Sequence, residues 1–304
     1  MRQLFSLLFL LTAALLSAAG LAGHQIDQLL RDEEPIRHIA GDLPEQEHFS
    51  EAVGSMMVDE LAERVPSQAQ GLIGDQVEGL VTGLIADVLE SDRTRTAWDE
   101  TLQTTRSDYA EQLETLFAEG SSGDPRELDV ELDLTPLTEA MTEPLREGLT
   151  QTLGWLPFLD ETSFDVLAPE IVVDVEAATD EQADPYTWAT LAGISQYWVW
   201  FFVAAGVLLL AGVLLGPGRF RWAALSFSAA VAAGIGLWIA LTVASPRFEQ
   251  PPGADPATLA ILDHVQHRVT EWAQPGWWVF TGVAGFLALA ALVAAVATPS
   301  ARRR

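Results

Sequence analysis

The chain has 304 residues, 49% of them hydrophobic, and a formal net charge of −27. It contains no cysteine and no lysine, which excludes disulfide bonds, thiol nucleophiles and thiolate metal sites. Of its 43 acidic residues, 39 lie between residues 23 and 192, against eight arginines there, and a surface of this kind repels nucleic acid.

Residues 4–22 form an apolar stretch that follows a single basic residue, Arg2, and ends in small residues. This pattern is typical of a cleaved signal peptide or of a retained anchor, and either one exports the chain that follows. Nineteen apolar residues are enough to span a bilayer. We therefore favour a signal anchor or transmembrane helix at residues 1–22.

Residues 23–192, called the acidic domain below, carry apolar positions at helical spacing. Two helices are expected within 49–65 and 73–88. A third helix is predicted to begin at the N-cap Ser91 and to end at Gly120. A fourth helix is expected after Thr135, with leucines recurring every four residues.

Two short segments of the acidic domain alternate like β-strands. In 127–134, apolar Leu and Val alternate with Glu and Asp, and 170–176 has a similar pattern. The simplest arrangement pairs the two strands and packs their apolar faces on the helices. The expected fold class is a mainly α membrane protein, in which a helical exported domain with a small two-stranded β ribbon is joined to a transmembrane helix bundle.

The membrane domain, residues 193–304, is predicted to hold three further spans at 194–215, 222–244 and 277–297. Between the last two lies an outer amphipathic loop, 245–275, with a helix that ends at Trp272. We also expect one continuous helix from Pro185 to Leu215.

Small residues recur at close-packing spacing in the spans, as Ala230-x-x-x-Gly234, Ala232-x-x-x-Gly236, Gly282 and Gly285. No ionisable residue lies within the three C-terminal spans, which favours an anchoring bundle over a transport pathway.

Arginines fix the expected orientation. Arg219 and Arg221 lie in the turn after the second span, and the chain ends in three arginines, 302–304. By the positive-inside rule both are cytoplasmic, so the acidic domain lies outside a multi-pass cell-membrane protein.

Three features of the sequence match a known group of proteins. They are Trp98 in its helix, the strand-to-helix element Val130-Glu-Leu-Asp-Leu-Thr-Pro-Leu137, and the hydropathy of the whole chain. The chain resembles uncharacterised bacterial envelope membrane proteins, mainly of GC-rich Gram-positive bacteria. Those proteins have an N-terminal anchor, a helical exported region and C-terminal spans. The resemblance implies the order of the elements and assigns no activity or site residue.

The paired strands gather carboxylates, including Asp129, Glu131, Asp133 and Asp174. Like charges opposite one another destabilise a sheet, so this face invites a counterion such as Ca²⁺. The positions expected for an EF-hand glycine and glutamate are Leu134 and Ala140, so it is not an EF-hand. The alternative is a solvated strand face.

His264 and His267 lie three residues apart on the amphipathic helix and offer a second metal hypothesis, a zinc or copper site. The alternative is an interfacial helix that lies on the membrane or on the acidic domain, with its histidines in water.

No Gly-x-Ser-x-Gly, His-Glu-x-x-His or phosphate-binding glycine loop occurs in the chain. A non-enzymatic envelope protein is therefore favoured, although paired carboxylates leave glycoside hydrolysis open. Its expected partners are the lipid bilayer and either an envelope protein or a second copy bound through the spans. The alternative is a sensor or accessory subunit of a membrane complex, with a transporter or pore component ranked lower.

Overall fold

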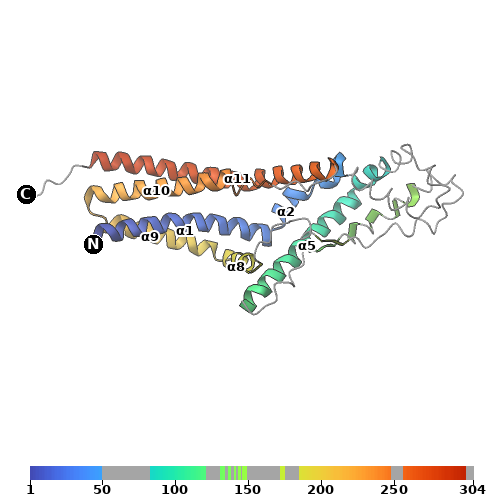
Figure 1. The fold of residues 1–304 in the computed structure, drawn as a ribbon, viewed down its shortest axis with the longest axis horizontal. Helices are drawn as coiled ribbons and strands as arrows, with labels where there is room; N and C mark the ends of the chain where they lie inside the picture. The colour runs from blue at the N-terminus through green and yellow to red at the C-terminus, as the bar shows by residue number, and fades with distance from the viewer. Residues whose placement is uncertain are drawn as a thin grey trace, which may run out of the picture.

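The structure is a computed structural model that describes residues 1–49, 83–120, 131–133, 172–174, 185–247 and 256–298, with short helical pieces between 136 and 148. The molecule is elongated, with a helix bundle at one end and the helices of the acidic domain at the other (Figure 1).

Within the described ranges, four helices are long and apolar enough to cross a membrane. They are α1 (Arg2–Arg31), α9 (Trp198–Leu215), α10 (Gly218–Leu241) and the part of α11 (Pro256–Ala297) from residue 259 onward. Large apolar side chains such as Leu214 and Phe286 lie exposed on the bundle, as expected for surfaces that face lipid. The prediction of a mainly α protein with helices long and apolar enough to span a membrane is confirmed.

The bundle consists of two closely packed pairs, α1 with α9 and α10 with α11, and α1 also packs on α10. Small residues allow the close approach. A Cβ added to Gly212 would lie 2.7 Å from Leu10 Cγ, and Ser6 Oγ donates to the Gly212 carbonyl at 2.7 Å. Gly236 makes the corresponding approach in the second pair, where an added Cβ would meet Thr281 Oγ1 at 2.6 Å.

Only part of the predicted small-residue packing occurs within the bundle. Ala232 is buried and Gly236 touches α11, so that pair lies in an interface. A Cβ added to Gly234, Gly282 or Gly285 would meet no atom within 4 Å. The sequence spacing identifies small residues, but it does not say which face of a helix meets a neighbour.

The predicted break between the amphipathic helix and the last span is wrong. Helix α11 runs for 42 residues and contains Pro275 in its interior. A proline removes one helical hydrogen bond and usually kinks or ends a helix. Here α11 is held on both sides of Pro275: Gln25 on α1 donates to the Ala273 carbonyl at 2.8 Å, and Trp277 Nε1 donates to Gln25 Oε1 at 2.7 Å.

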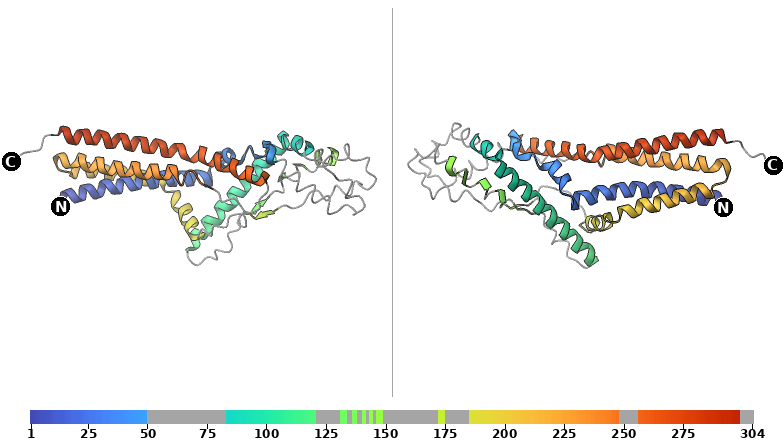
Figure 2. Two further views of the ribbon diagram at one scale, coloured as in Figure 1. Left: turned by 45° about the horizontal axis from the view of Figure 1, so that its top comes forward. Right: turned by 180° about the vertical axis from the view of Figure 1, so that it is seen from behind.

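The predicted continuous helix from 185 to 215 is also wrong. Helix α8 (Pro185–Ser195) ends before α9 begins, and it turns away from the bundle toward α5 (Figure 2). Side chains satisfy the last carbonyls of α8, since Ser195 Oγ donates to Ala192 and Gln196 Nε2 donates to Gly193, each at 2.7 Å. Such local bonds compete with continued helix.

The third helix of the acidic domain is confirmed as α5 (Asp92–Glu119). Ser91 is its N-cap and accepts from the Thr94 N–H at 3.3 Å, while Gly120, with φ of 64°, is its C-cap. The predicted helix at 49–65 and most of the one at 73–88 lie outside the described residues.

One apolar core joins the acidic domain to α11. It forms where α5, the helical residues 83–89, α2 (Glu33–Ala40) and the 3₁₀ turn η1 (Leu43–Glu45) meet. Its buried members include Ile39, Leu43, Ile85, Leu89, Trp98 and Leu102. Four residues of α11 pack against it, namely Ile261, Val265, Val269 and Trp272. The amphipathic helix therefore lies on the acidic domain.

Two three-residue strands, β1 (Glu131–Asp133) and β2 (Val172–Asp174), pair antiparallel. Leu132 lies opposite Val173 in the register. The rest of the two predicted strands lies outside the described residues, as do the ends of the fourth predicted helix and the arginine tail.

Candidate functional site

The candidate site is the junction where α1, α5, α8 and α11 meet at the domain end of the bundle. Its polar side chains fall into two groups. The Arg31 cluster comprises Asp27, Arg31, Glu114, Ser195 and Trp198, and the Asp42 cluster comprises Asp42, His264 and Arg268.

The Arg31 cluster joins α1, α5 and α8 through one guanidinium and reaches α9 through Asp27. Arg31, on the last turn of α1, is paired with Asp27 at 2.6 Å and with Glu114 of α5 at 2.7 Å. It also donates to Ser195 Oγ of α8 at 3.2 Å. Trp198 Nε1 of α9 donates to Asp27 Oδ2 at 3.2 Å. The forked geometry of arginine suits it to holding several acceptors at once.

Apolar contacts surround this cluster. Leu30, Leu113 and Leu116 are buried between α1, α5 and α8. Phe117 lies against α8, because a Cβ added to Gly193 would come 2.4 Å from its ring. Arg106 Nη1 donates to the Leu30 carbonyl at 2.6 Å, which satisfies an acceptor at the end of α1. The end of α5 is therefore packed on both α1 and α8.

The Asp42 cluster ties the start of the acidic domain to α11. Arg268 Nη2 donates to Asp42 Oδ2, and His264 Nε2 lies 3.2 Å from Asp42 Oδ1. The three side chains are roughly one quarter exposed, at 29% for Asp42, 22% for His264 and 27% for Arg268. Burial alone would raise the pKa of Asp42, but hydrogen bonds from Arg268 and His264, together with their charge, lower it.

Further ion pairs fix α2 and η1 on α5. Arg37 donates to both carboxylate oxygens of Asp99, at 2.8 and 2.9 Å, and this hydrogen bonding lowers the pKa of Asp99. Arg95 pairs with Glu45 at 2.9 Å, with both side chains nearly half exposed. Trp98 Nε1, deeply buried, donates to the Ala40 carbonyl at 2.7 Å.

The chemistry of the junction is that of a structural connection. The carboxylates of Asp27, Asp42, Asp99 and Glu114 each face an arginine. The pKa of Asp42 and that of Asp99 are both lowered, which makes these two carboxylates poor general acids at neutral pH, because proton donation needs a pKa near the operating pH. The arrangement is suited to joining helices from the two ends of the molecule.

The two histidines of the predicted metal site have different partners. His264 points to Asp42, whereas His267 is 71% exposed and lies 3.2 Å from Glu271 of its own helix. Among the residues that the structure describes, no group of three or more His, Cys, Asp or Glu side chains is arranged to hold a metal ion.

The predicted acidic face is described only through its backbone. The register of β1 and β2 places Glu131 opposite Asp174 and Asp133 opposite Val172. Asp129 lies outside the described residues. The proximity of Glu131 and Asp174 along the ladder is the arrangement from which the calcium hypothesis starts.

Of the residues in the two clusters, only His264 was predicted from the sequence as a site residue. Asp27 and Arg31 carry a signal, since an Asp and an Arg four residues apart directly follow an apolar span. The partners Glu114, Ser195 and Asp42 carry none, because they lie far from Arg31 or Arg268 in the sequence.

Comparison of the chain with protein-family models, with curated proteins and with solved structures finds no match.

Proposed function

We propose that the protein is a non-enzymatic membrane protein that holds an acidic, mainly helical domain outside the cytoplasmic membrane of a bacterial cell, where the domain binds other components of the envelope. The observation that carries this proposal is the junction: α1 and α11 each run without a break from the packed helices of the acidic domain into the bundle. A domain built in this way is held at a fixed position relative to the membrane.

The surface of α5 supports a binding role. Its exposed side includes acidic residues along its whole length, namely Asp92, Glu100, Asp108, Glu111, Glu114 and Glu119. Acidic surfaces attract basic partners over about 10 Å at moderate salt and speed their association. The partner that fits this surface is a basic segment of another envelope protein.

The proposed orientation rests on the positive-inside rule. The structure places Arg219 and Arg221 in the first residues of α10, and not in the turn where they were predicted. This start of α10 lies at the end of the bundle away from the acidic domain (Figure 1). Because the chain lacks cysteine, single cysteines can test this orientation. In intact cells, a membrane-impermeant maleimide should label Glu119→Cys and should label Arg219→Cys only after the membrane is opened. The reverse pattern would refute the orientation.

A photo-crosslinking amino acid at Thr115, an exposed residue among the acidic positions of α5, tests the binding role. In native membranes it should yield a discrete protein adduct that is lost in the charge-reversed variant Asp108→Arg/Glu111→Arg. An adduct that survives charge reversal would contradict an electrostatic surface, and the absence of any protein adduct would contradict binding through α5.

The second candidate is a sensor or accessory subunit of a membrane complex, and it is favoured by the continuity of α1 and α11. The expected route was a continuous helix from 185 to 215, but this segment is divided into α8 and α9. A change in the acidic domain would therefore reach the bundle through α1 and α11. Binding a partner should then change the accessibility of cysteines placed at the loop end of the bundle. A pure binding protein would show no such change.

A further inference from the structure

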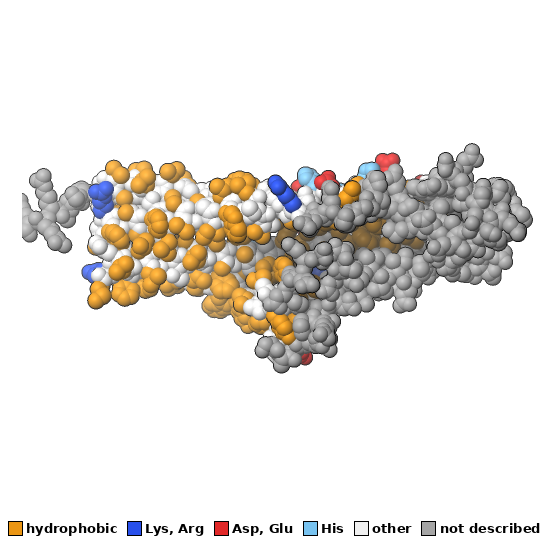
Figure 3. All heavy atoms as spheres, in the orientation of Figure 1, with side chains coloured by type: hydrophobic (Ala, Val, Ile, Leu, Met, Phe, Trp, Pro, Cys, Tyr) orange, Lys and Arg blue, Asp and Glu red, His pale blue; other side chains and the backbone are white. Residues whose placement is uncertain are grey.

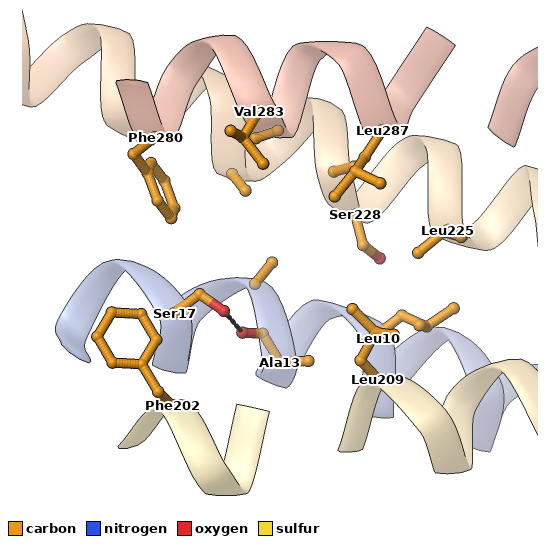
Figure 4. Close-up of a pocket in the computed structure, with 14 residues that line it drawn as sticks. Leu10, Ala13, Ser17, Phe202, Leu209, Leu225, Ser228, Phe280, Val283 and Leu287 are labelled. Atoms are coloured by element: carbon orange, nitrogen blue, oxygen red, sulfur yellow. Dashed lines mark hydrogen bonds between the residues drawn. The ribbon is translucent and has the colours of Figure 1, made fainter. Parts of the chain in front are cut away.

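The bundle has a lateral groove between α9 and α11 that the proposed function does not use. Its volume is about 230 Å³. In Figure 4, side chains of α9 and α11 face each other across the groove, while α1 and α10 contribute mostly small residues, with Leu10 and Leu225 as the exceptions. The lining comes from residues 10–17, 202–209, 225–232 and 280–287.

The dimensions of the groove limit its occupant. Each lining stretch advances seven residues, so the groove is about 10 Å long at 1.5 Å per residue. A helix that spans a bilayer is about 10 Å across and about 30 Å long, so it is much larger than a groove of about 230 Å³. A single hydrocarbon chain fits this space, and a transmembrane helix does not.

The lining is chemically suited to hydrocarbon. Phe202 and Phe280 lie at one end, and leucines such as Leu10 and Leu225 lie at the other (Figure 4). The Ser17 hydroxyl donates to its own helix, at the Ala13 carbonyl, 2.8 Å away. Ser228, which is 1% exposed, has no partner, but a helical serine can bond a carbonyl of its preceding turn.

Arginines lie one turn beyond the leucine end of the groove. Arg221 precedes Leu225 by four residues on α10. Gly216 lies against both α10 and α1, because a Cβ added to it would lie 2.5 Å from Arg221 Cβ and 2.8 Å from Ser6 Oγ. Arginine side chains are visible at this end of the apolar bundle in Figure 3. Among the described residues, neither Arg219 nor Arg221 is paired with a carboxylate, and Arg221 Nε is buried without a partner.

We propose that the groove and Arg219/Arg221 form a binding site for one anionic phospholipid. One acyl chain lies in the groove, and the phosphate binds the two arginines at the loop end of the bundle. Burial of the acyl chain against apolar walls supplies the part of the affinity that does not depend on the headgroup. The arginines supply the preference for an anionic headgroup, since basic residues between transmembrane helices bind such headgroups.

The full-length protein, purified in detergent and stripped of lipid, is titrated with phosphatidylglycerol or phosphatidylcholine of identical chains, and bound lipid is counted by native mass spectrometry. We expect one tight site that prefers phosphatidylglycerol by at least about fivefold, the effect of a single basic residue near the surface. Equal binding of the two lipids would overturn the proposal. Glycerol phosphate, which has no acyl chains, should not displace phosphatidylglycerol. Displacement by glycerol phosphate at the same concentration as the lipid would overturn the role of the groove.

Matched variants separate the two halves of the site. Val283 and Val279 lie one turn apart on α11 and are 56% and 67% exposed, but only Val283 lines the groove. Val283→Phe should weaken binding of both lipids at least tenfold, and Val279→Phe should not. The double variant Arg219→Gln/Arg221→Gln should remove the preference for phosphatidylglycerol without changing the binding of phosphatidylcholine. The control variant Arg247→Gln should keep this preference. Equal effects within either matched set would overturn the proposal.

Discussion

The ion pair between Asp42 and Arg268 should contribute measurably to the attachment of α11 to the acidic domain. A charged pair near a protein surface gains up to about 4 kcal/mol at 4 Å with an effective dielectric constant of 20. Side-chain ordering and desolvation reduce this gain, and fully exposed pairs retain less than about 1 kcal/mol. Because Asp42 and Arg268 are 29% and 27% exposed and hydrogen-bonded, we expect a coupling energy of about 2 kcal/mol.

The coupling is measured by a double-mutant cycle of Asp42→Asn and Arg268→Gln in the full-length protein. The readout is the free energy of local opening of residues 259–272, obtained by hydrogen exchange with mass spectrometry. The control cycle uses Glu45→Gln and Arg95→Gln, whose side chains are 46% and 47% exposed, and should give about 0.5 kcal/mol. Equal couplings in the two cycles would refute the reasoning from burial.

Three further predictions follow from individual groups. The folded-state pKa of Asp42 is lowered, so its stabilisation is present above the unfolded pKa of about 3.9 and is lost as the pH falls through the lower folded value. Opening of residues 259–272 should therefore not increase between pH 7 and pH 5, and it should increase only below about pH 4. An increase already near pH 6 would contradict this assignment. Trp98→Phe should lower the free energy of unfolding, measured in denaturant, by about 1 to 3 kcal/mol, because the buried Ala40 carbonyl loses its donor. A decrease of less than about 0.5 kcal/mol would show that water replaces the indole as the donor. Calcium should raise the melting temperature of the wild-type protein beyond a sodium control of equal ionic strength, and the double variant Glu131→Gln/Asp174→Asn should abolish this increase. An equal increase in the two proteins would exclude the ribbon of β1 and β2 as the calcium site.

Local sequence signals predicted the elements that are determined locally. Ser91 and Gly120 bound α5 because capping depends on adjacent residues. The apolar spans were found because a bilayer imposes a length and a composition. These signals did not predict the full length of α1, which continues to Arg31 well past its apolar stretch because it packs on the distant helices α5 and α8.

The errors arose where contacts between distant segments outweigh local preference. Pro275 indicated a break, but α1 holds both sides of it through Gln25. One continuous helix was predicted from 185 to 215, but Ser195 bonds the end of α8 and contacts Arg31, which also pairs with Glu114 of α5. The junction was missed for the same reason, because its arginines and carboxylates are separated by up to 226 residues.

The central claim is that α11 belongs to both the acidic domain and the bundle. It is tested most directly by cysteine cross-linking in native membranes, since the wild-type chain has no cysteine. Asp42→Cys/His264→Cys should cross-link rapidly with a short bifunctional maleimide, because His264 faces Asp42 at 3.2 Å. Asp42→Cys/His267→Cys should react much more slowly, because His267 lies on the exposed side of α11. Equal rates, or no cross-linking of the first pair, would contradict the claim.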